Sequence, residues 1–229
     1  MLRSIRYGEA DRVLHLYSED RGRIGAIAKG VRRVRSRLGG RLEPLMRGSL
    51  VLHAGRGELC TISSADTVDA HASLRERRAA LERASQAADA VLRLLDAGEP
   101  NRPAYNLLCR ELQLLDEDPG AATRAQALAF RLKLLLAAGF APELAACASC
   151  GERSELSGFS PSAGGVVCPA CEAGSFPISA AAHEFMVESL GRPLAQIDRD
   201  APEGALAVVD RALAETLEHH AHVRLRRVA

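Results

Sequence analysis

The stretch DRVLHLYSEDRGRIGAIAKG, residues 11–30, holds two short alternating segments joined by a polar turn. In the first, Val13–Tyr17, Leu14 and Leu16 lie on one face, and the second, Ile24–Ala28, alternates in the same way. A period of two is typical of β-strands that bury one face. This stretch therefore predicts two strands connected by the turn SEDRGR.

Further strands are expected on both sides of this pair. The candidates are Leu2–Tyr7 before it, and Gly48–Ala54 and Glu58 to about Asp69 after it, the last two flanking a turn at Gly55–Gly57. Most of these strands have no helix between them. An open sheet of such strands would leave unpaired edges that no helix covers, whereas a closed barrel leaves none. We therefore expect the first seventy residues to form a small, closed, five-stranded β-barrel.

From Leu74 onward the pattern changes to long segments rich in Ala and Leu with helical spacing. Glycine, proline and N-cap signals divide this region into helices; they are expected at Leu74–Ala97, from Pro103 to about Asp116, at Ala121–Ala138, from Ser179 to about Gly191, and from Pro202 onward. The chain is therefore expected to be an α+β, multidomain protein, with a β-barrel at residues 1–70 and an all-α domain at residues 71–229.

A concentrated positive segment, KGVRRVRSRLGGR at residues 29–41, follows the second strand of the opening stretch. Residues 1–70 carry thirteen Lys or Arg against eight Asp or Glu, although the whole chain has a net charge of only +1. A local field of this kind attracts polyanions, and a solvated charge run without a partner is the alternative. The candidate contact residues are Lys29, Arg32, Arg33, Arg35, Arg37 and Arg41.

The expected helical domain is interrupted by CASCGERSELSGFSPSAGGVVCPAC, which contains two C-x-x-C pairs with seventeen residues between them. This spacing predicts a four-thiolate zinc site in a finger at about residues 144–176. Four thiolates leave no open position for water, so the expected role is structural. The candidate ligands are Cys147, Cys150, Cys168 and Cys171.

Other uses of these cysteines fit the sequence less well. Disulfides would need an oxidising compartment, to which the chain shows no route, and neither pair follows a strand in a βαβ pattern of the redox type. A zinc deaminase would need an H-x-E motif, and no histidine has a glutamate two residues later. Cys60 and Cys109 are interpreted as small apolar residues.

No Walker loop, dinucleotide fingerprint, G-x-S-x-G or H-E-x-x-H motif occurs in the sequence. We therefore expect a protein that is not an enzyme. The start of the chain has no apolar signal segment, and no later run reaches the eighteen apolar residues of a membrane span. The expected location is cytoplasmic.

A barrel with a basic loop beside its strands is a familiar arrangement for binding nucleic acid. Residues 1–70 offer only Tyr7 and Tyr17 as stacking aromatics. Binding is therefore expected to depend on Arg and Lys contacts to phosphate, to weaken strongly with salt, and to accept both single- and double-stranded DNA.

Several motifs, taken in order, resemble the bacterial recombination mediator RecO family. They are Gly8-Glu9-Ala10-Asp11-Arg12, Gly22-Arg23, Ala28-Lys29-Gly30, Arg41-Leu42-Glu43-Pro44, Gly139-Phe140-Ala141-Pro142, and Gly164-Gly165-Val166-Val167 ahead of the second cysteine pair. The resemblance covers most of the chain. It implies an N-terminal five-stranded OB-fold β-barrel, an all-α helical domain and an inserted four-cysteine zinc finger.

The resemblance also implies a function. It implies a non-enzymatic, nucleoid-associated DNA repair protein that anneals strands coated by single-stranded DNA-binding protein and works with RecR to load RecA. It places Lys29 and the five arginines in the matching basic loop. Members of the family usually begin several residues earlier, so we expect either a shortened first strand or a start that was assigned too late.

Two further expectations concern partners. The tail of single-stranded DNA-binding protein would need an apolar groove with a basic rim, for which Arg131 and Lys133 are candidates, with ordinary core packing as the alternative. The competing function is a zinc-ribbon protein-interaction or transcription adaptor whose basic loop binds an acidic protein.

Overall fold

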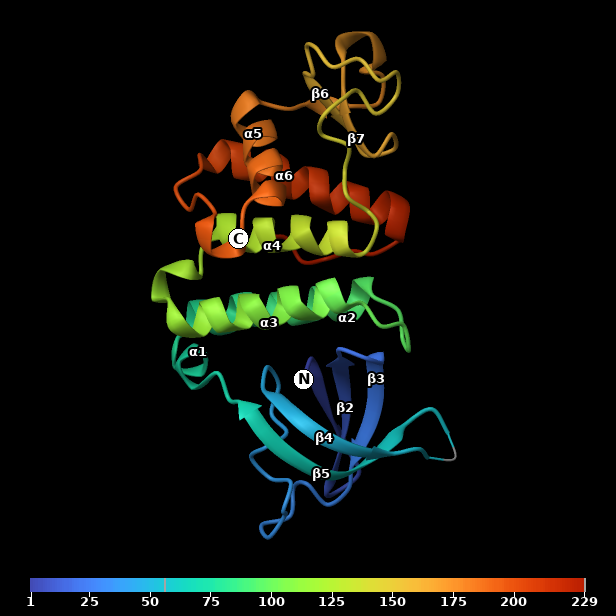
Figure 1. Ribbon diagram of the computed structural model, residues 1–229, viewed down its shortest axis with the longest axis vertical. Coiled ribbons are helices and arrows are strands. Elements are labelled where there is room, and N and C mark those ends of the chain that lie inside the picture. Colours follow the sequence, from blue (N-terminus) through green and yellow to red (C-terminus); the bar gives the residue numbers. More distant parts are fainter. Residues whose placement is uncertain (56, 229) are drawn as a thin grey trace. The chain divides into compact units, whose positions relative to one another are not determined.

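The computed structural model describes residues 1–55 and 57–228 and divides into two compact units, Met1–Pro119 and Gly120–Ala229. The first unit contains a five-stranded sheet and three helices, and the second contains three α-helices with a cysteine-bearing insert (Figure 1). The expected α+β class, with an N-terminal OB-like sheet before a helical part, is confirmed. The first compact unit includes helices beyond residue 70, so the expected domain boundary there stays a prediction.

The sheet of the first unit has the strand order β1-β2-β3-β5-β4. Its only parallel pair among the described residues is β3 with β5, and the other neighbours are antiparallel. Arg56, in the expected turn before the last strand, lies outside the described residues. The strands are β1 (Arg3–Tyr7), β2 (Asp11–Ser18), β3 (Gly22–Ala28), β4 (Arg47–His53) and β5 (Cys60–Asp69).

The barrel core follows from the alternation seen in the sequence. Side chains of one parity on β2 and β3 point inward, as do Ile62 and Ala65 on β5, where the register with β4 shifts between them, and the loop after β3 adds further apolar side chains. The buried cluster comprises Leu14, Leu16, Ala26, Ala28, Val31, Leu42, Ile62 and Ala65. Because Val31 and Leu42 come from the basic segment and the residue after it, that segment is held against the core by apolar residues while its charged residues remain outside.

The two edge strands, β1 and β4, form no ladder with each other in the described part of the chain. Two backbone hydrogen bonds link this side instead: the Met1 amino group donates to the Met46 carbonyl at 2.7 Å, and the Leu45 N–H donates to the Met1 carbonyl at 2.8 Å. Burial lowers the pKa of the Met1 amino group to about 6. The first strand is short, as expected, with five residues.

The three helices of the first unit are α1 (Ala72–Glu76), α2 (Arg78–Leu94) and α3 (Arg102–Glu117). The single helix expected over Leu74–Ala97 is wrong, because Arg77 is extended (φ −114°, ψ 109°) and separates α1 from α2. The Arg77 guanidinium donates to the Leu115 carbonyl at 2.8 Å. At the break between α1 and α2, the side chain of Arg77 therefore satisfies a carbonyl at the end of α3. Helical periodicity in the sequence does not reveal this contact.

The helices of the second unit are α4 (Arg124–Ala137), α5 (Ala180–Gly191) and α6 (Glu203–Thr216), followed by one π-helical turn, η4 (Leu217–Ala221). Helix α4 buries residues around its whole circumference, including Phe130 and Leu134, and contacts both α5 and α6. A helix that is buried on all sides lies at the centre of packing. No helix in the described residues is long and apolar enough to cross a membrane.

The insert between α4 and α5 folds as a small three-stranded sheet in the order β7-β6-β8. Its strands are β6 (Gly158–Ser160), β7 (Gly165–Val167) and β8 (Phe176–Pro177). Figure 1 shows this finger as a separate lobe of the second unit, beside α5 and α6. With so few strand residues, the lobe needs another source of stability.

Candidate nucleic-acid interface and metal centre

The basic loop, residues 29–41, is tied to the turn between β1 and β2. The Gly30 N–H donates to the Asp11 carboxylate at 2.7 Å, and the Arg32 N–H donates to the Ala10 carbonyl at 2.9 Å. Gly30 has a φ of +64°, a left-handed conformation that glycine adopts without strain. The loop therefore starts from a defined position at one end of the sheet.

All six predicted contact residues lie on this loop and are exposed. Arg32 donates to the Glu9 carbonyl at 3.0 Å, and Arg41 donates to the Ala65 carbonyl at 3.0 Å and lies 3.5 Å from Asp66. The other four side chains form no hydrogen bond or ion pair with any residue that the structure describes; they are Lys29, Arg33, Arg35 and Arg37. These four cations are available to a ligand.

The one acidic residue in the sequence segment around the loop is neutralised within the protein. Glu43, the only Asp or Glu between residues 21 and 47, accepts from Arg12 at 2.9 Å. That ion pair removes the negative charge that would otherwise oppose a polyanion at the end of the loop. The sequence shows Glu43 but does not show that a residue on β2 pairs with it.

The structure separates the two tyrosines of the first seventy residues. Tyr17 is 8% exposed, and its hydroxyl donates to the Asn101 carbonyl at 3.3 Å. Tyr7 is 58% exposed, at the end of β1 beside the turn that holds the loop. Only Tyr7 can present its ring to a ligand, and the sequence offered no local signal that separates the two tyrosines.

Arg131 and Lys133, the candidates for binding a partner's tail, lie in the packing of the second unit. Arg131 is 5% exposed and lies 3.5 Å from the buried carboxylate of Asp210. Lys133 donates to the Leu190 carbonyl at 3.3 Å, and burial lowers its pKa. An acidic tail could reach Arg131 only by displacing Asp210, so the structure favours ordinary core packing for Arg131. The tail-binding role stays a prediction.

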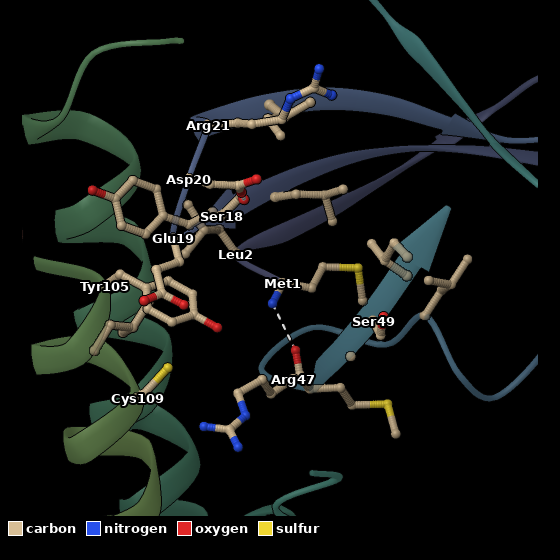
Figure 2. Close-up of a pocket in the computed structure, with 18 of the residues that line it drawn as sticks. Met1, Leu2, Ser18, Glu19, Asp20, Arg21, Arg47, Ser49, Tyr105 and Cys109 are labelled. Atoms are coloured by element: carbon tan, nitrogen blue, oxygen red, sulfur yellow. Dashed lines mark hydrogen bonds between the residues drawn. The ribbon is translucent and has the colours of Figure 1, made fainter. Parts of the chain in front are cut away.

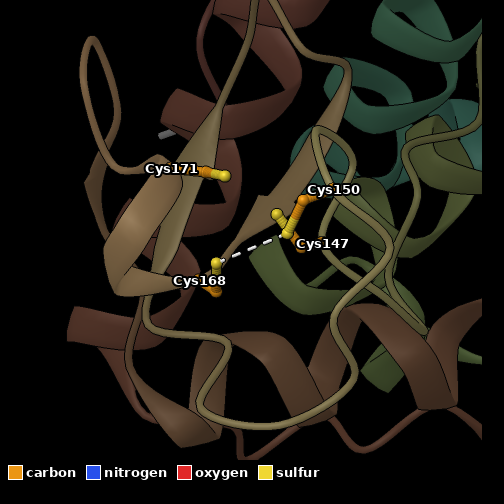
Figure 3. A group of neighbouring side chains, drawn as sticks. All are labelled: Cys147, Cys150, Cys168 and Cys171. Atoms are coloured by element: carbon orange, nitrogen blue, oxygen red, sulfur yellow. Dashed lines mark hydrogen bonds between the residues drawn. The ribbon is translucent and has the colours of Figure 1, made fainter.

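The four predicted zinc ligands come together in the finger (Figure 3). Their sulfur atoms all lie within 4.8 Å of one another, and the sulfurs of Cys150 and Cys168 are 3.7 Å apart. A tetrahedron with Zn–S bonds of about 2.3 Å has edges of about 3.8 Å. The spacing therefore fits one tetrahedral ion, and it is much longer than the disulfide bond length of about 2.0 Å.

Each pair of cysteines is shaped by a tight turn. The Gly151 N–H donates to the Cys147 carbonyl at 2.8 Å, and the Cys171 N–H donates to the Cys168 carbonyl at 2.9 Å. Gly151 has a φ of +80°, which a residue with a side chain rarely adopts. These turns direct both sulfurs of each pair toward the same point, as a structural zinc site requires.

The pKa values of the cysteine cluster are those of thiols held close together without a cation. Backbone N–H groups, first that of Cys168, lower the pKa of Cys147 to about 6. Hydrogen bonding from Cys150, with burial and the neighbouring thiols, raises the pKa of Cys171 to about 12. Four sulfurs this close cannot all ionise without a cation among them. A divalent metal supplies that charge, since thiolates are its ligands.

The finger is attached to the rest of the second unit at defined contacts. His183 on α5 donates through Nε2 to the Leu144 carbonyl at 2.7 Å, and His220 donates to the Pro161 carbonyl at 2.7 Å. The guanidinium carbon of Arg211 on α6 lies 4.0 Å from the centre of the Phe176 ring. These contacts couple the folding of the finger to the helices α5 and α6.

The first unit also contains a cavity of about 1090 Å³ between α3 and the ends of the strands (Figure 2). Arg102 and Glu19 in its wall form an ion pair at 2.7 Å. Burial, followed by Cys109, raises the pKa of Tyr105, so this hydroxyl holds its proton more tightly. That shift is opposite to the activation expected of a catalytic tyrosine near neutral pH.

Comparison with known proteins accounts for nearly the whole chain. The family described as "Recombination protein O N terminal" matches residues 1–71, and "Recombination protein O C terminal" matches residues 75–227. The chain belongs to the RecO family.

Similarity to individual RecO proteins is also extensive. A "DNA repair protein RecO" of Rubrobacter xylanophilus is 40% identical over 86% of this chain and 80% of its own length. Those of Anaeromyxobacter sp. and Pelotomaculum thermopropionicum are 33% and 36% identical, over 98% and 86% of this chain and 90% and 77% of their own lengths. The RecO resemblance expected from the sequence motifs is therefore confirmed.

Proposed function

We propose that this protein binds DNA strands through phosphate contacts of the basic loop, anneals complementary strands coated by single-stranded DNA-binding protein, and helps RecR to load RecA. Membership of the RecO family supports a role in DNA repair. The observation that carries the finer proposal is the loop itself, with four exposed cations that no described residue neutralises.

The chemistry of the loop suits phosphate better than base edges. Arginine guanidinium groups bind phosphate oxygens in a bidentate manner, and such contacts position a strand without reading its sequence. The loop is anchored at its start and packed against the core by Val31 and Leu42, so little ordering is needed when a strand binds. Both single- and double-stranded DNA present the same phosphate groups.

Annealing follows from charge neutralisation. Two strands repel each other through their phosphates, and a surface that neutralises both lowers the free energy needed to bring them together. Weak sequence discrimination is an advantage for this activity, because any complementary pair must be accepted. No covalent step is needed, which agrees with a mediator that is not an enzyme.

The metal has a structural role in this proposal. Four cysteines fill a tetrahedral coordination shell, so bound zinc would hold the finger together and would offer no position for activating water. The ligands would be Cys147, Cys150, Cys168 and Cys171. Partner proteins would then bind a second unit whose finger is kept folded by the metal.

The test compares two variants that lose the same charge. Arg33, Arg35 and Arg37 are changed together to Gln, and the control changes the exposed helix residues Arg78, Arg93 and Arg110 to Gln. Losing three phosphate contacts lowers the slope of log K against log salt by about 2 on single strands. The loop variant should lose strand binding and annealing in low salt, while the control variant should keep both.

Two outcomes would contradict the proposal. One is equal behaviour of the loop and control variants in binding and in annealing of strands coated by the cognate single-stranded DNA-binding protein. The other is a loop variant that keeps DNA binding and annealing but loses an acidic protein partner, which is the result expected of an adaptor.

A further inference from the structure

A row of apolar side chains crosses the outer face of the barrel next to the basic loop. Ile5 on β1 is opposite Val13 on β2, and Val13 is opposite Ile27 on β3. Directly opposed residues on neighbouring strands have side chains on the same face of a sheet. The three β-branched side chains therefore form one continuous strip across three strands.

This strip is separate from the barrel core. Leu14 and Ala26, which alternate with the strip residues, are fully buried inside the barrel, whereas the strip residues do not belong to the core cluster. Ile5 is 43% exposed, and Tyr7 on the same face of β1 is 58% exposed. The strip and the tyrosine ring together form an apolar surface that solvent can reach.

The strip lies beside the basic loop. Tyr7 is opposite Asp11, and the Asp11 carboxylate accepts from Gly30 at the start of the loop. Ile27 precedes Lys29 by two residues at the end of β3. A strand bound to the loop cations would therefore have its bases within reach of Tyr7 and the strip.

The charge around this face is positive. Arg3 is exposed, has the same strand parity as the strip and is opposite His15, whose pKa is lowered by burial and then by Arg3 and Arg23. Arg23 donates to the Leu92 carbonyl, so Arg3 and the loop cations form the cationic border. The acids on this side are Asp11, which accepts from the Gly30 N–H, and the exposed Glu9 of the neighbouring turn, and they are outnumbered by the six exposed cations of the basic loop. An apolar surface with a cationic border matches a polymer that has flat apolar bases and an anionic backbone.

We propose that this outer face binds the unpaired bases of a single strand, with Tyr7 as a stacking residue and Ile5, Val13 and Ile27 as an apolar floor. The proposal rests on the proposed function, because the loop holds the phosphates of the same strand. The proposal adds that the protein distinguishes single-stranded DNA from duplex DNA. Bases in a duplex are stacked on each other, and only an unpaired base can stack on Tyr7.

Stacking and phosphate contacts respond differently to salt. Neutralising phosphates releases counterions, so that part of the affinity falls as salt rises. Stacking on an aromatic ring releases none and tolerates any base. The affinity for single strands should therefore retain a component at high salt, and this component should depend on Tyr7.

The test measures binding of a single-stranded oligonucleotide and of its duplex by Tyr7→Ala, Tyr7→Phe and the control Val68→Ala. Val68 is 56% exposed on β5 and lies outside the strip. Tyr7→Ala should weaken single-strand binding at least about fivefold with an unchanged salt slope, and duplex binding should stay within about twofold. Tyr7→Phe and Val68→Ala should bind both forms like the unmodified chain.

A second measurement uses the intact side chain. The chain has three tyrosines and no tryptophan, so its emission comes from tyrosine. A single strand should quench this emission in the unmodified chain and not in Tyr7→Phe. Unchanged single-strand affinity of Tyr7→Ala, equal losses for single strand and duplex, or quenching that survives in Tyr7→Phe would each overturn the proposal. Absence of any binding by the unmodified chain would overturn the proposed function as well.

Discussion

Loss of the metal should destabilise the second unit far more than it weakens DNA binding. The perturbation is the double variant Cys150→Ala and Cys171→Ala, which removes one ligand from each pair. The matched control is Cys60→Ala and Cys109→Ala, which removes two cysteines outside the finger. The control should bind one zinc ion per chain, and the finger variant should bind none.

The expected magnitude follows from the binding free energy of the metal. The buried cluster around the site consists of Cys147, Val167 and Cys168, two of which are themselves ligands. A site filled at about a thousand times its dissociation constant stabilises the folded state by about 4 kcal/mol. Since about 1 kcal/mol changes the melting temperature of a unit of this size by roughly 4 °C, the loss should be on the order of 15 °C.

The assay is thermal unfolding beside oligonucleotide binding, with the finger variant and with chelator-treated protein. The basic loop belongs to the first unit and the cysteines to the second, so DNA affinity should change less than about threefold.

The affinity of the finger for zinc should depend on pH. Cys147, with a pKa of about 6, is ionised above pH 6, whereas the pKa values of Cys150 and Cys171 are raised, so these two thiols must release protons when zinc binds at neutral pH. Zinc affinity should therefore fall as pH drops through the neutral range, and fall more steeply below pH 6, where Cys147 also binds a proton.

The reasoning would be refuted by a finger variant that keeps its melting temperature and loses DNA binding. That result would place the metal centre in the DNA interface and remove its structural role. A control variant that loses zinc would equally contradict the assignment of the four ligands.

Two further changes probe the second unit. Asp210→Asn should lower the free energy of unfolding, measured by urea denaturation, by about 3–5 kcal/mol. The reason is that it removes the charge of a carboxylate that is 1% exposed and faces Arg131. A loss below about 1 kcal/mol would contradict a stabilising ion pair. Gly165→Ala should weaken zinc binding in a chelator competition, because its new Cβ would lie 2.3 Å from the Glu143 carbonyl oxygen. The control Gly191→Ala, whose Cβ would meet no atom within 4 Å, should leave zinc binding unchanged.

Much of the fold could be predicted because its signals are local. The alternation of Leu14 and Leu16 gives the parity of β2, and the two C-x-x-C pairs bring their sulfurs together through short turns. The basic loop is visible as a run of cations. Each of these patterns depends on neighbours in the chain, so the sequence contains the whole signal.

Other features could not be predicted because they depend on distant partners. The break at Arg77 accompanies a hydrogen bond to Leu115 on another helix, and the burial of Arg131 depends on Asp210, far away in the chain. Helical periodicity was the same with or without these contacts. From the sequence, Arg131 beside apolar residues was therefore compatible both with the rim of a binding groove and with a buried position in the core.

The sequence by itself determined the parities of β2 and β3, the four thiolates and the cationic loop, because periodicity, ligand spacing and charge are properties of consecutive residues. Tertiary structure decided which tyrosine is exposed, which cations are free and which acid is neutralised. Tyr7 and Tyr17 are the same residue type on strands of the same sheet, yet only one is covered by a later segment of the chain. Exposure is a property of what packs against a side chain, and those contacts come from residues far away in the sequence.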